Sequence, residues 1–428
     1  MRDVLITGVG IVSPIGIGVD EVAASLTERR TGIRRSPELE AVGWLAPFGG
    51  LIEGFEAKQY VKPRKSLKVM AREIQLGFAA AELAWANAGL EDAEIDPARL
   101  GVVGAAGMQY CPLPELAGPF AACGDGQATP REWGERGMRE LFPLWMLKYL
   151  PNMGSCHVGI RRSAYGPTNT ISLGDVSGLL ALGEGAAAIE RGAADAMLCG
   201  GASSKIDLTD LLWHAGAGLS RRGEDAERAC RPFDADRDGA VMGEGGAYLI
   251  LESRDHAERR GFFRRGGQAW GAVTSVASRC EASHCSRLPT GRAIEQAAAA
   301  ALEHAGVAAS DLAMVKPHGE ARPDLDPIEA QSLERVIGPA PVFAPTSYFG
   351  SCGASRGVIE LATALVGWRG GAVPATLNYE QPDPACPLSV ANEPRPATGA
   401  CLLAINHSPS GQAVAAVVRG EEGLGKKY

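Results

Sequence analysis

Short runs of valine, isoleucine and leucine alternate along the chain with longer stretches in which alanine and leucine recur at helical spacing. The runs DVLIT, LGVVG, DAMLC, YLILE, LAMVK and CLLAI predict buried strands. The stretches 71–89, 294–306 and 358–368 predict helices. Buried strands that alternate with helices indicate an α/β protein whose sheets are covered on both faces.

A charged stretch, SRDHAERRG, interrupts this pattern after the strand YLILE. We place a boundary there, between Ser253 and Gly261, which divides the chain into halves at 1–255 and 256–428. Each half contains a buried strand followed by a polar loop, TISLGD in the first and AMVKPHGE in the second. This correspondence suggests a duplicated architecture.

Composition narrows the class of protein. Apolar residues make up 46% of the 428 positions and charged residues 21%, which is typical of a globular chain. The net charge of −8 argues against a nucleic-acid partner. There is no apolar run near the roughly 20 residues of a membrane helix and no signal-peptide pattern, so we expect a cytoplasmic protein. The ten cysteines lie mostly in apolar contexts, as expected for reduced thiols.

Two polar loops carry the candidate chemistry. In GPTNTISLGDVSG, residues 166–178, a strand turns at a glycine and opens a helix, with Asp175 on the turn. Asp175 has a structural interpretation as the N-cap of that helix, and a catalytic one as a base or nucleophile beside His318. His318 follows the strand LAMVK, and the next helix begins at DPIE with a predicted capping box of Asp326 and Glu329.

Several longer stretches together resemble the β-ketoacyl synthases of fatty acid and polyketide synthesis. They are VLITGVGIVSPIG, GPTNTISLGDVSGLLALGEG, RPFDADRDGAVMGEGGAYLILE, KPHGEARPDLDPIEA and LNYEQPDP. The resemblance runs almost end to end and implies the thiolase-like α/β fold, two similar halves in an α-β-α-β-α arrangement.

The resemblance also shows what has changed at the catalytic positions. Active family members use a cysteine nucleophile, two histidines and a lysine. The matching positions here are Asp175 for the cysteine, His318 for the first histidine, Thr346 for the lysine and Ser351 for the second histidine. Three of these four positions therefore differ from the family pattern, and we assign no confident catalytic residue.

Substrate handling is expected to differ as well. Where the family places two threonines against the pantetheine arm, this chain has Glu320 and Arg322. The family's glycine- and phenylalanine-rich gate is replaced by NHSPSGQ, residues 406–412. The stretch at Met108, Gln109 and Tyr110 matches a region that approaches the partner's acyl pocket; it either shapes a cavity at the interface or belongs to the core.

Two further motifs suggest sites that we reject on the sequence. The stretch CEASHC contains Cys280, His284 and Cys285 but has no second ligand cluster at zinc-like spacing, so we expect no metal. GVVGAAGMQY follows a strand but lacks the order of a dinucleotide motif. We expect no cofactor of the chain's own, only an acyl chain on the phosphopantetheine of a partner carrier protein.

The altered positions resemble those of chain-length-factor subunits of type II polyketide synthases. The resemblance implies a subunit that pairs with an active ketosynthase, shapes the cavity for the growing acyl chain and contacts an acyl carrier protein. The product class, aromatic or polyene, stays open. One alternative is a stand-alone hydrolase or acyltransferase that uses Asp175 and His318. Another is a non-catalytic homodimer that binds an acyl ligand or a carrier protein.

Overall fold

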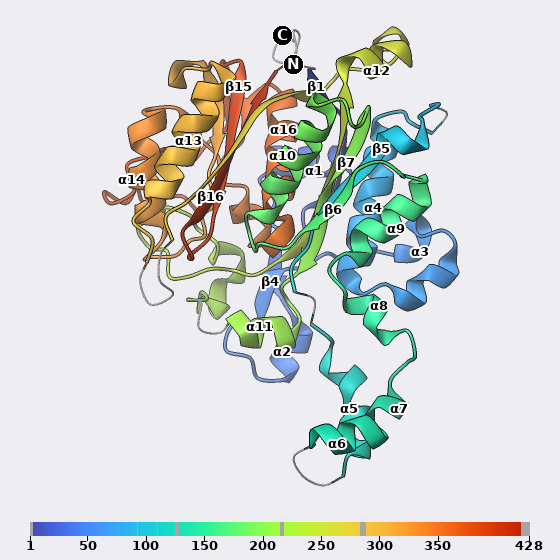
Figure 1. Cartoon of the computed structure of the whole chain (residues 1–428). Helices are drawn as coiled ribbons and strands as arrows, with labels where there is room; N and C mark the ends of the chain where they lie inside the picture. Colours follow the sequence, from blue (N-terminus) through green and yellow to red (C-terminus); the bar gives the residue numbers. More distant parts are fainter. Residues whose placement is uncertain are drawn as a thin grey trace.

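Two half-sheets that share a middle layer of helices form the body of the protein (Figure 1). The computed structural model describes residues 3–91, 93–108, 110–124, 128–214, 218–282 and 288–420. Within them, twelve strands join into one sheet with the order β13-β11-β10-β15-β16-β9-β1-β8-β7-β5-β6, and β2 pairs with β1.

The strands and helices occupy the following ranges. The strands are β1 Val4–Ser13, β2 Gly16–Ile17, β3 Ile33–Arg35, β4 Phe48–Gly50, β5 Leu100–Ala105, β6 Thr168–Ile171, β7 Ala196–Ser204, β8 Glu244–Ser253, β9 Gly271–Cys280, β10 Leu312–Lys316, β11 Pro341–Val342, β12 Ala372–Val373, β13 Ser389–Val390, β14 Arg395–Pro396, β15 Cys401–His407 and β16 Gln412–Arg419. The helices are α1 Val19–Glu28, α2 Pro37–Ala41, α3 Ala57–Tyr60, α4 Arg72–Asn87, α5 Leu113–Ala122, α6 Pro130–Glu132, α7 Met138–Glu140, α8 Trp145–Tyr149, α9 Met153–Arg162, α10 Ser177–Glu190, α11 Leu208–His214, α12 Arg254–Arg259, α13 Arg292–Ala305, α14 Asp326–Ile337, α15 Thr346–Phe349 and α16 Arg356–Arg369.

The periodicity of the sequence predicts these main elements correctly. The six apolar runs are β1, β5, β7, β8, β10 and β15, and the three helical stretches are α4, α13 and α16. Each of these six strands is buried along its whole length, because helices cover both faces of the sheet.

The layers follow the expected α-β-α-β-α order. Helix α4 covers the outer face of β1, β8 and β7, while α13 packs on the outer face of β9 and β16. Helices α10 and α16 lie between the two half-sheets and contact strands of both. Only three residue pairs, at Val4–Ile6 and Gly271–Val273, join the half-sheets through β1 and β9. The division at 253–261 stays a prediction; α12 begins within that interval.

The first turns of the two middle helices, α10 and α16, are in direct contact because each has a glycine there. A Cβ added at Gly178 of α10 would lie 2.8 Å from the backbone nitrogen of Val358, and one at Gly357 of α16 would lie 2.8 Å from that of Leu179. Only glycine fits such a backbone contact. The contact brings the turn before α10, which carries Asp175, next to the first turn of α16.

A helical segment projects from the body at α5, α6 and α7 (Figure 1). It and the following helix α8 carry large apolar side chains that are exposed in the single chain: Leu113, Phe120, Met138, Phe142 and Met146. Strand β6 lies at the edge of the sheet, with Thr168 and Asn169 exposed. These side chains form an apolar surface that the rest of the chain leaves uncovered. No helix in the described ranges is long and apolar enough to cross a membrane.

Candidate functional site

Asp175 lies on the turn between β6 and α10, but it does not cap the helix. Helix α10 begins at Ser177, and its N-cap residue is Val176, without a side-chain cap. The Ser177 hydroxyl stabilises the turn instead: it donates to the Gly174 carbonyl at 2.6 Å and accepts from the Leu173 N–H at 2.8 Å. The predicted N-cap role of Asp175 is therefore wrong. Its side chain is 23% exposed and faces the end of β10.

His318 lies on the loop after β10, which buried carboxylates hold in place. The backbone N–H groups of His318 and Gly319 donate to the two oxygens of Glu329 at 2.6 and 2.8 Å. Asp326 accepts from the N–H of Glu320 at 3.0 Å. Helix α14 begins at Asp326 with Leu325 as N-cap, so the predicted capping box does not form. Both carboxylates fix the loop rather than the helix, because they point back toward it.

Arg356, at the start of α16, connects the polar groups of the site. Its Nη1 donates to His318 Nε2 at 3.0 Å and to the Ser351 hydroxyl at 3.4 Å. Its Nη2 donates to the carbonyls of His318 and Gly319 and to the Thr346 hydroxyl. The side chain is completely buried. Its fork of donors thus ties together the loop after β10, α15 and α16.

Glu360, one helical turn further along α16, supplies the main counter-charge. It accepts from Arg356 Nε at 2.8 Å, from Lys316 Nζ at 2.6 Å and from the Thr346 hydroxyl at 2.6 Å. Burial raises the pKa of this carboxyl, but the positive charges of Arg356 and Lys316 outweigh burial and hold the pKa below its ordinary value. Glu360 is therefore ionised.

His318 is a neutral imidazole. Its Nε2 accepts from Arg356 Nη1, so the proton of the neutral ring lies on Nδ1, which is 3.2 Å from the amide nitrogen of Asn406 and does not accept from it. Burial, followed by the charge of Arg356, lowers the pKa of His318 well below its ordinary value.

The predicted partnership of Asp175 and His318 does not form as a hydrogen bond. Asp175 Oδ2 lies 3.9 Å from His318 Nε2, beyond hydrogen-bond reach, and equally 3.9 Å from Arg356 Nη1. The Arg356 guanidinium donates to His318 Nε2, the nitrogen that would have to accept a proton if His318 were a catalytic base. This geometry weighs against a hydrolase that uses Asp175 and His318.

Glu320 and Arg322, the two substituted tunnel positions, behave differently from each other. Glu320 is almost buried and lies 3.6 Å from Arg356 Nη1 and 4.0 Å from His318 Nε2. Burial raises its pKa to about 7, although the charge of Arg356 opposes the shift. Arg322 pairs with Asp324 at 2.6 Å. The sequence places both residues at the site, but only Glu320 contacts its charged centre.

Asp175, His318 and Glu320 bring three potential metal ligands within 4.8 Å of one another. Their donor atoms surround the Arg356 guanidinium, which lies 3.0 Å from the imidazole nitrogen and 3.6 Å from Glu320. A metal ion would need the same lone pairs beside a permanent cation. The residues therefore do not fit a metal ion.

The structure describes only some of the remaining predicted positions. Met108 is 65% exposed, and Tyr110 stacks on Trp213 of α11 with ring centroids 5.6 Å apart, so Met108 is not part of the core of the single chain. Gln109, His284 and Cys285 lie outside the described residues. Cys280 is exposed at the end of β9. The stretch 406–412 connects β15 to β16, and Asn406 faces His318.

The sequence does not identify Lys316, Arg356 or Glu360 as residues of this network, and it indicates Asn406 and His407 only as part of the replaced gate at 406–412. The imidazole of His407 packs against that of His318, with ring centroids 4.3 Å apart, and its Nε2 lies 3.6 Å from Glu329. One signal was present: RGVIE places an arginine four residues before a glutamate inside an otherwise apolar helix, a spacing that puts both on one face.

Comparisons with known proteins agree with this architecture. The family model "Beta-ketoacyl synthase, N-terminal domain" matches residues 1–257, and "Beta-ketoacyl synthase, C-terminal domain" matches residues 270–380. The tetracenomycin polyketide synthase ketoacyl synthase alpha subunit of Streptomyces glaucescens is 31% identical, over 92% of each chain. The 3-oxoacyl-[acyl-carrier-protein] synthase 2 of Synechocystis is 30% identical, over 90% of each chain.

Solved structures show the same fold. A β-ketoacyl synthase from Burkholderia phymatum superposes with a TM-score of 0.86 at 27% identity and covers 98% of this chain and all of its own. The ishigamide ketosynthase/chain length factor gives a TM-score of 0.83 at 24% identity, covering 98% of this chain and 99% of its own. The second likeness supports the fold alone.

Proposed function

Because the chain belongs to the β-ketoacyl synthase family, we propose that it is a non-catalytic subunit of the chain-length-factor type. It pairs with an active ketosynthase and shapes the cavity for the acyl chain in type II polyketide or polyene synthesis. The acyl chain arrives on the phosphopantetheine of an acyl carrier protein, and the complex works in the cytoplasm.

The observation that carries this proposal is the position of Arg356. Its guanidinium lies against Thr346 and Ser351, the positions that match the family's lysine and second histidine. It also donates hydrogen bonds to His318 and to Glu360, so one guanidinium occupies acceptors of all four side chains. Such a network stabilises the fold and offers no thiolate and no second imidazole to a thioester.

The negative charge beside Arg356 also disfavours the family's reaction. Asp175 occupies the position that matches the family's nucleophile. Its carboxylate lies 3.9 Å from Arg356 Nη1, and that of Glu320 lies 3.6 Å from the same nitrogen. A carboxylate is a poor nucleophile toward thioesters, and it repels the carboxylate of a malonyl group. We therefore assign condensation to the partner's site.

The exposed apolar side chains support pairing with a second chain. The exposed apolar side chains of α5–α8 belong to one continuous segment of the chain. Trp213 of α11 is 69% exposed and stacks on Tyr110. An obligate interface buries more than about 2,000 Å², which is enough to cover such surfaces. Among related structures, one is described as a type II acyl-carrier protein in complex with its ketosynthase, and another as a ketosynthase/chain length factor.

The proposal is tested by co-expressing the chain with the active ketosynthase of its biosynthetic system. We expect a one-to-one complex in size-exclusion chromatography, and extension of malonyl-loaded carrier protein only when both chains are present. Asp175→Ala should leave extension within about twofold, because Asp175 makes no hydrogen bond to His318 or Arg356. The matched control is the nucleophilic cysteine of the partner, whose change to alanine should abolish extension.

Two results would contradict the proposal. One is a homodimer that turns over an acyl thioester alone and loses this activity with Asp175→Ala, since Asp175 would then be catalytic. The other is a homodimer that binds an acyl ligand or carrier protein tightly and does not assemble with the ketosynthase.

A further inference from the structure

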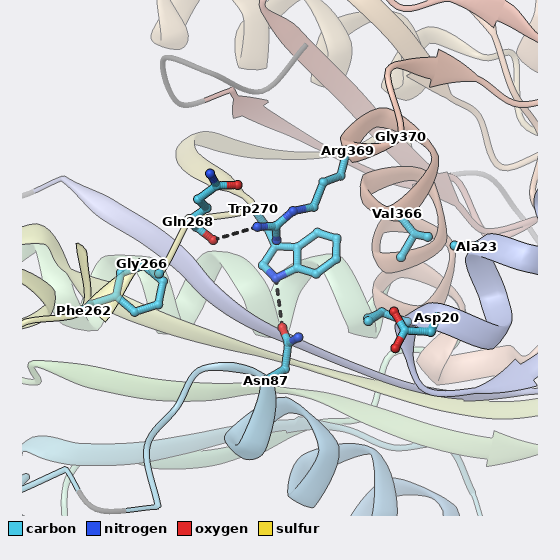
Figure 2. Close-up of a pocket in the computed structure, with 12 residues that line it drawn as sticks. Asp20, Ala23, Asn87, Phe262, Gly266, Gln268, Trp270, Val366, Arg369 and Gly370 are labelled. Atoms are coloured by element: carbon cyan, nitrogen blue, oxygen red, sulfur yellow. Dashed lines mark hydrogen bonds between the residues drawn. The ribbon is translucent and has the colours of Figure 1, made fainter. Parts of the chain in front are cut away.

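A pocket lies at the opposite end of α16 from the candidate site. It has a volume of about 520 Å³ and lies where α1, the end of α4, the segment before β9 and the C-terminal turn of α16 meet (Figure 2). Arg356 and Arg369 are the first and last residues of α16, so about 20 Å of buried helix separates the pocket from the site. The volume lies within the range of small-molecule sites, roughly 300–1,000 Å³.

Arg369 supplies the main charge of this pocket. Its guanidinium lies over the Trp270 ring, 4.1 Å from the centroid, and Nη2 donates to the Gln268 carbonyl at 3.2 Å. It makes no ion pair with any carboxylate among the described residues. Burial lowers the pKa of Arg369, and no neighbouring acid opposes this shift. In a chain with a net charge of −8, a half-buried arginine without an acidic partner is available to an anion.

Asn87, exposed at the end of α4, adds a second donor to the lining of the pocket (Figure 2). Its side-chain oxygen accepts from the Val9 N–H and from the Trp270 indole N–H, both at 2.9 Å. These two donors fix the orientation of the amide. Its Nδ2 therefore points away from them, and it donates to no group in the part of the chain that the structure describes.

The walls determine which anion would fit. Phe262 lies on one side of Trp270, and Val366 and Asp20 lie on the other (Figure 2). Asp20 lies in the first turn of α1, where the helix dipole stabilises a negative charge. A carboxylate at that wall disfavours a doubly charged phosphate more than it disfavours a single carboxylate. The aromatic and aliphatic walls offer contact to an apolar body.

We propose that this pocket binds a monocarboxylate with an apolar body, anchored by Arg369 and Asn87. The carboxylate lies beside the guanidinium and accepts from Asn87 Nδ2, while the apolar body packs against Phe262 and Val366. This site is separate from the proposed pairing function and does not depend on it.

The test is calorimetric titration of the full-length protein with octanoate and with benzoate. We expect saturable binding of at least one of them, and none of octanamide or inorganic phosphate. Arg369→Met should weaken binding about tenfold or more, because a charge-assisted hydrogen bond is lost. The matched control, Arg335→Met, removes an exposed arginine of α14 and should leave the affinity unchanged.

A second variant separates ligand binding from packing of Arg369 on Trp270. Asn87→Asp keeps the oxygen that accepts from Val9 and Trp270 but replaces the free donor by an acceptor. We expect it to abolish carboxylate binding while circular dichroism and thermal unfolding stay close to those of the original protein. The proposal is wrong if neither carboxylate binds, if phosphate binds as tightly as octanoate, or if both variants bind like the original protein.

Discussion

Replacing Arg356 by methionine is expected to lower the free energy of unfolding by about 3–5 kcal/mol. Methionine keeps much of the apolar volume but removes every donor of the guanidinium. The His318 and Gly319 carbonyls and the Thr346 hydroxyl lose a partner in a fully buried region. Glu360 keeps Lys316 but loses its second cation. Breaking a buried ion pair on one side is costly because the other charge stays in low dielectric.

The measurement is urea unfolding at one fixed protomer concentration, since pairing of subunits adds to apparent stability. Arg335→Met is the matched control, because this arginine pairs with Glu295 at the surface; it should change stability by less than about 1 kcal/mol. Arg356→Lys should fall between the two, since an ammonium keeps the charge but cannot reach all of the acceptors. A loss below about 1 kcal/mol for Arg356→Met would show that the network does not stabilise the fold.

A double-mutant cycle tests whether Arg356 stabilises the fold through its ion pair with Glu360. Glu360→Gln alone removes the carboxylate that accepts from both Lys316 and Arg356, and leaves Arg356 only the longer contact of 3.6 Å with Glu320, so it should also destabilise the protein. Combined with Arg356→Met, its cost should be smaller than the sum of the two single changes, because the second change removes a charge that the first left unpaired. Additive costs would mean that Arg356 acts through the carbonyls alone.

The sequence predicts the fold well because apolar periodicity is a local property. The six apolar runs and three helical stretches become the strands and helices of the core, since each pattern is read within a single segment. The order of the strands is not local. The pairing of β1 with β8 and with β9 joins residues some 250 positions apart, and only the family resemblance suggests it.

The candidate site is predicted in part, for a related reason. The resemblance identifies Asp175, His318, Thr346 and Ser351 as neighbours, and the structure places them around one guanidinium. It does not identify that guanidinium, because Arg356 matches no catalytic position of the family.

The local capping rules fail at the same site. They predict Asp175 and Asp326 as N-caps, whereas Asp175 turns toward Arg356 and Asp326 binds the N–H of Glu320. Long-range charge and backbone donors override a preference worth only about 1 kcal/mol.

Glu320→Gln is expected to change how stability depends on pH. Burial raises the pKa of Glu320 in the folded protein to about 7, against an ordinary value of 4.5. Between these values the folded state binds more protons than the unfolded state, so this residue makes stability fall as pH rises from about 4.5 to 7. Above pH 7 the ionised carboxylate costs up to about 3 kcal/mol. Glutamine has no such charge, so the variant should gain stability relative to the original protein as pH rises through this window.

The difference between variant and original isolates Glu320 from other buried acids, such as Asp326, whose pKa burial raises to about 6. Glu295→Gln, at the surface beside Arg335, is the matched control, and its difference in stability from the original protein should not change from pH 4.5 to 8.

Asp175 also raises the pKa of Glu320, so Asp175→Asn should move the pH window of the Glu320 effect to lower pH. If the difference for Glu320→Gln is also flat, Glu320 titrates as an ordinary exposed carboxyl, and the negative charge beside Arg356 is permanent at neutral pH. If the difference rises as expected, Glu320 binds a proton in acid, and the negative charge that opposes a malonyl group is weaker there.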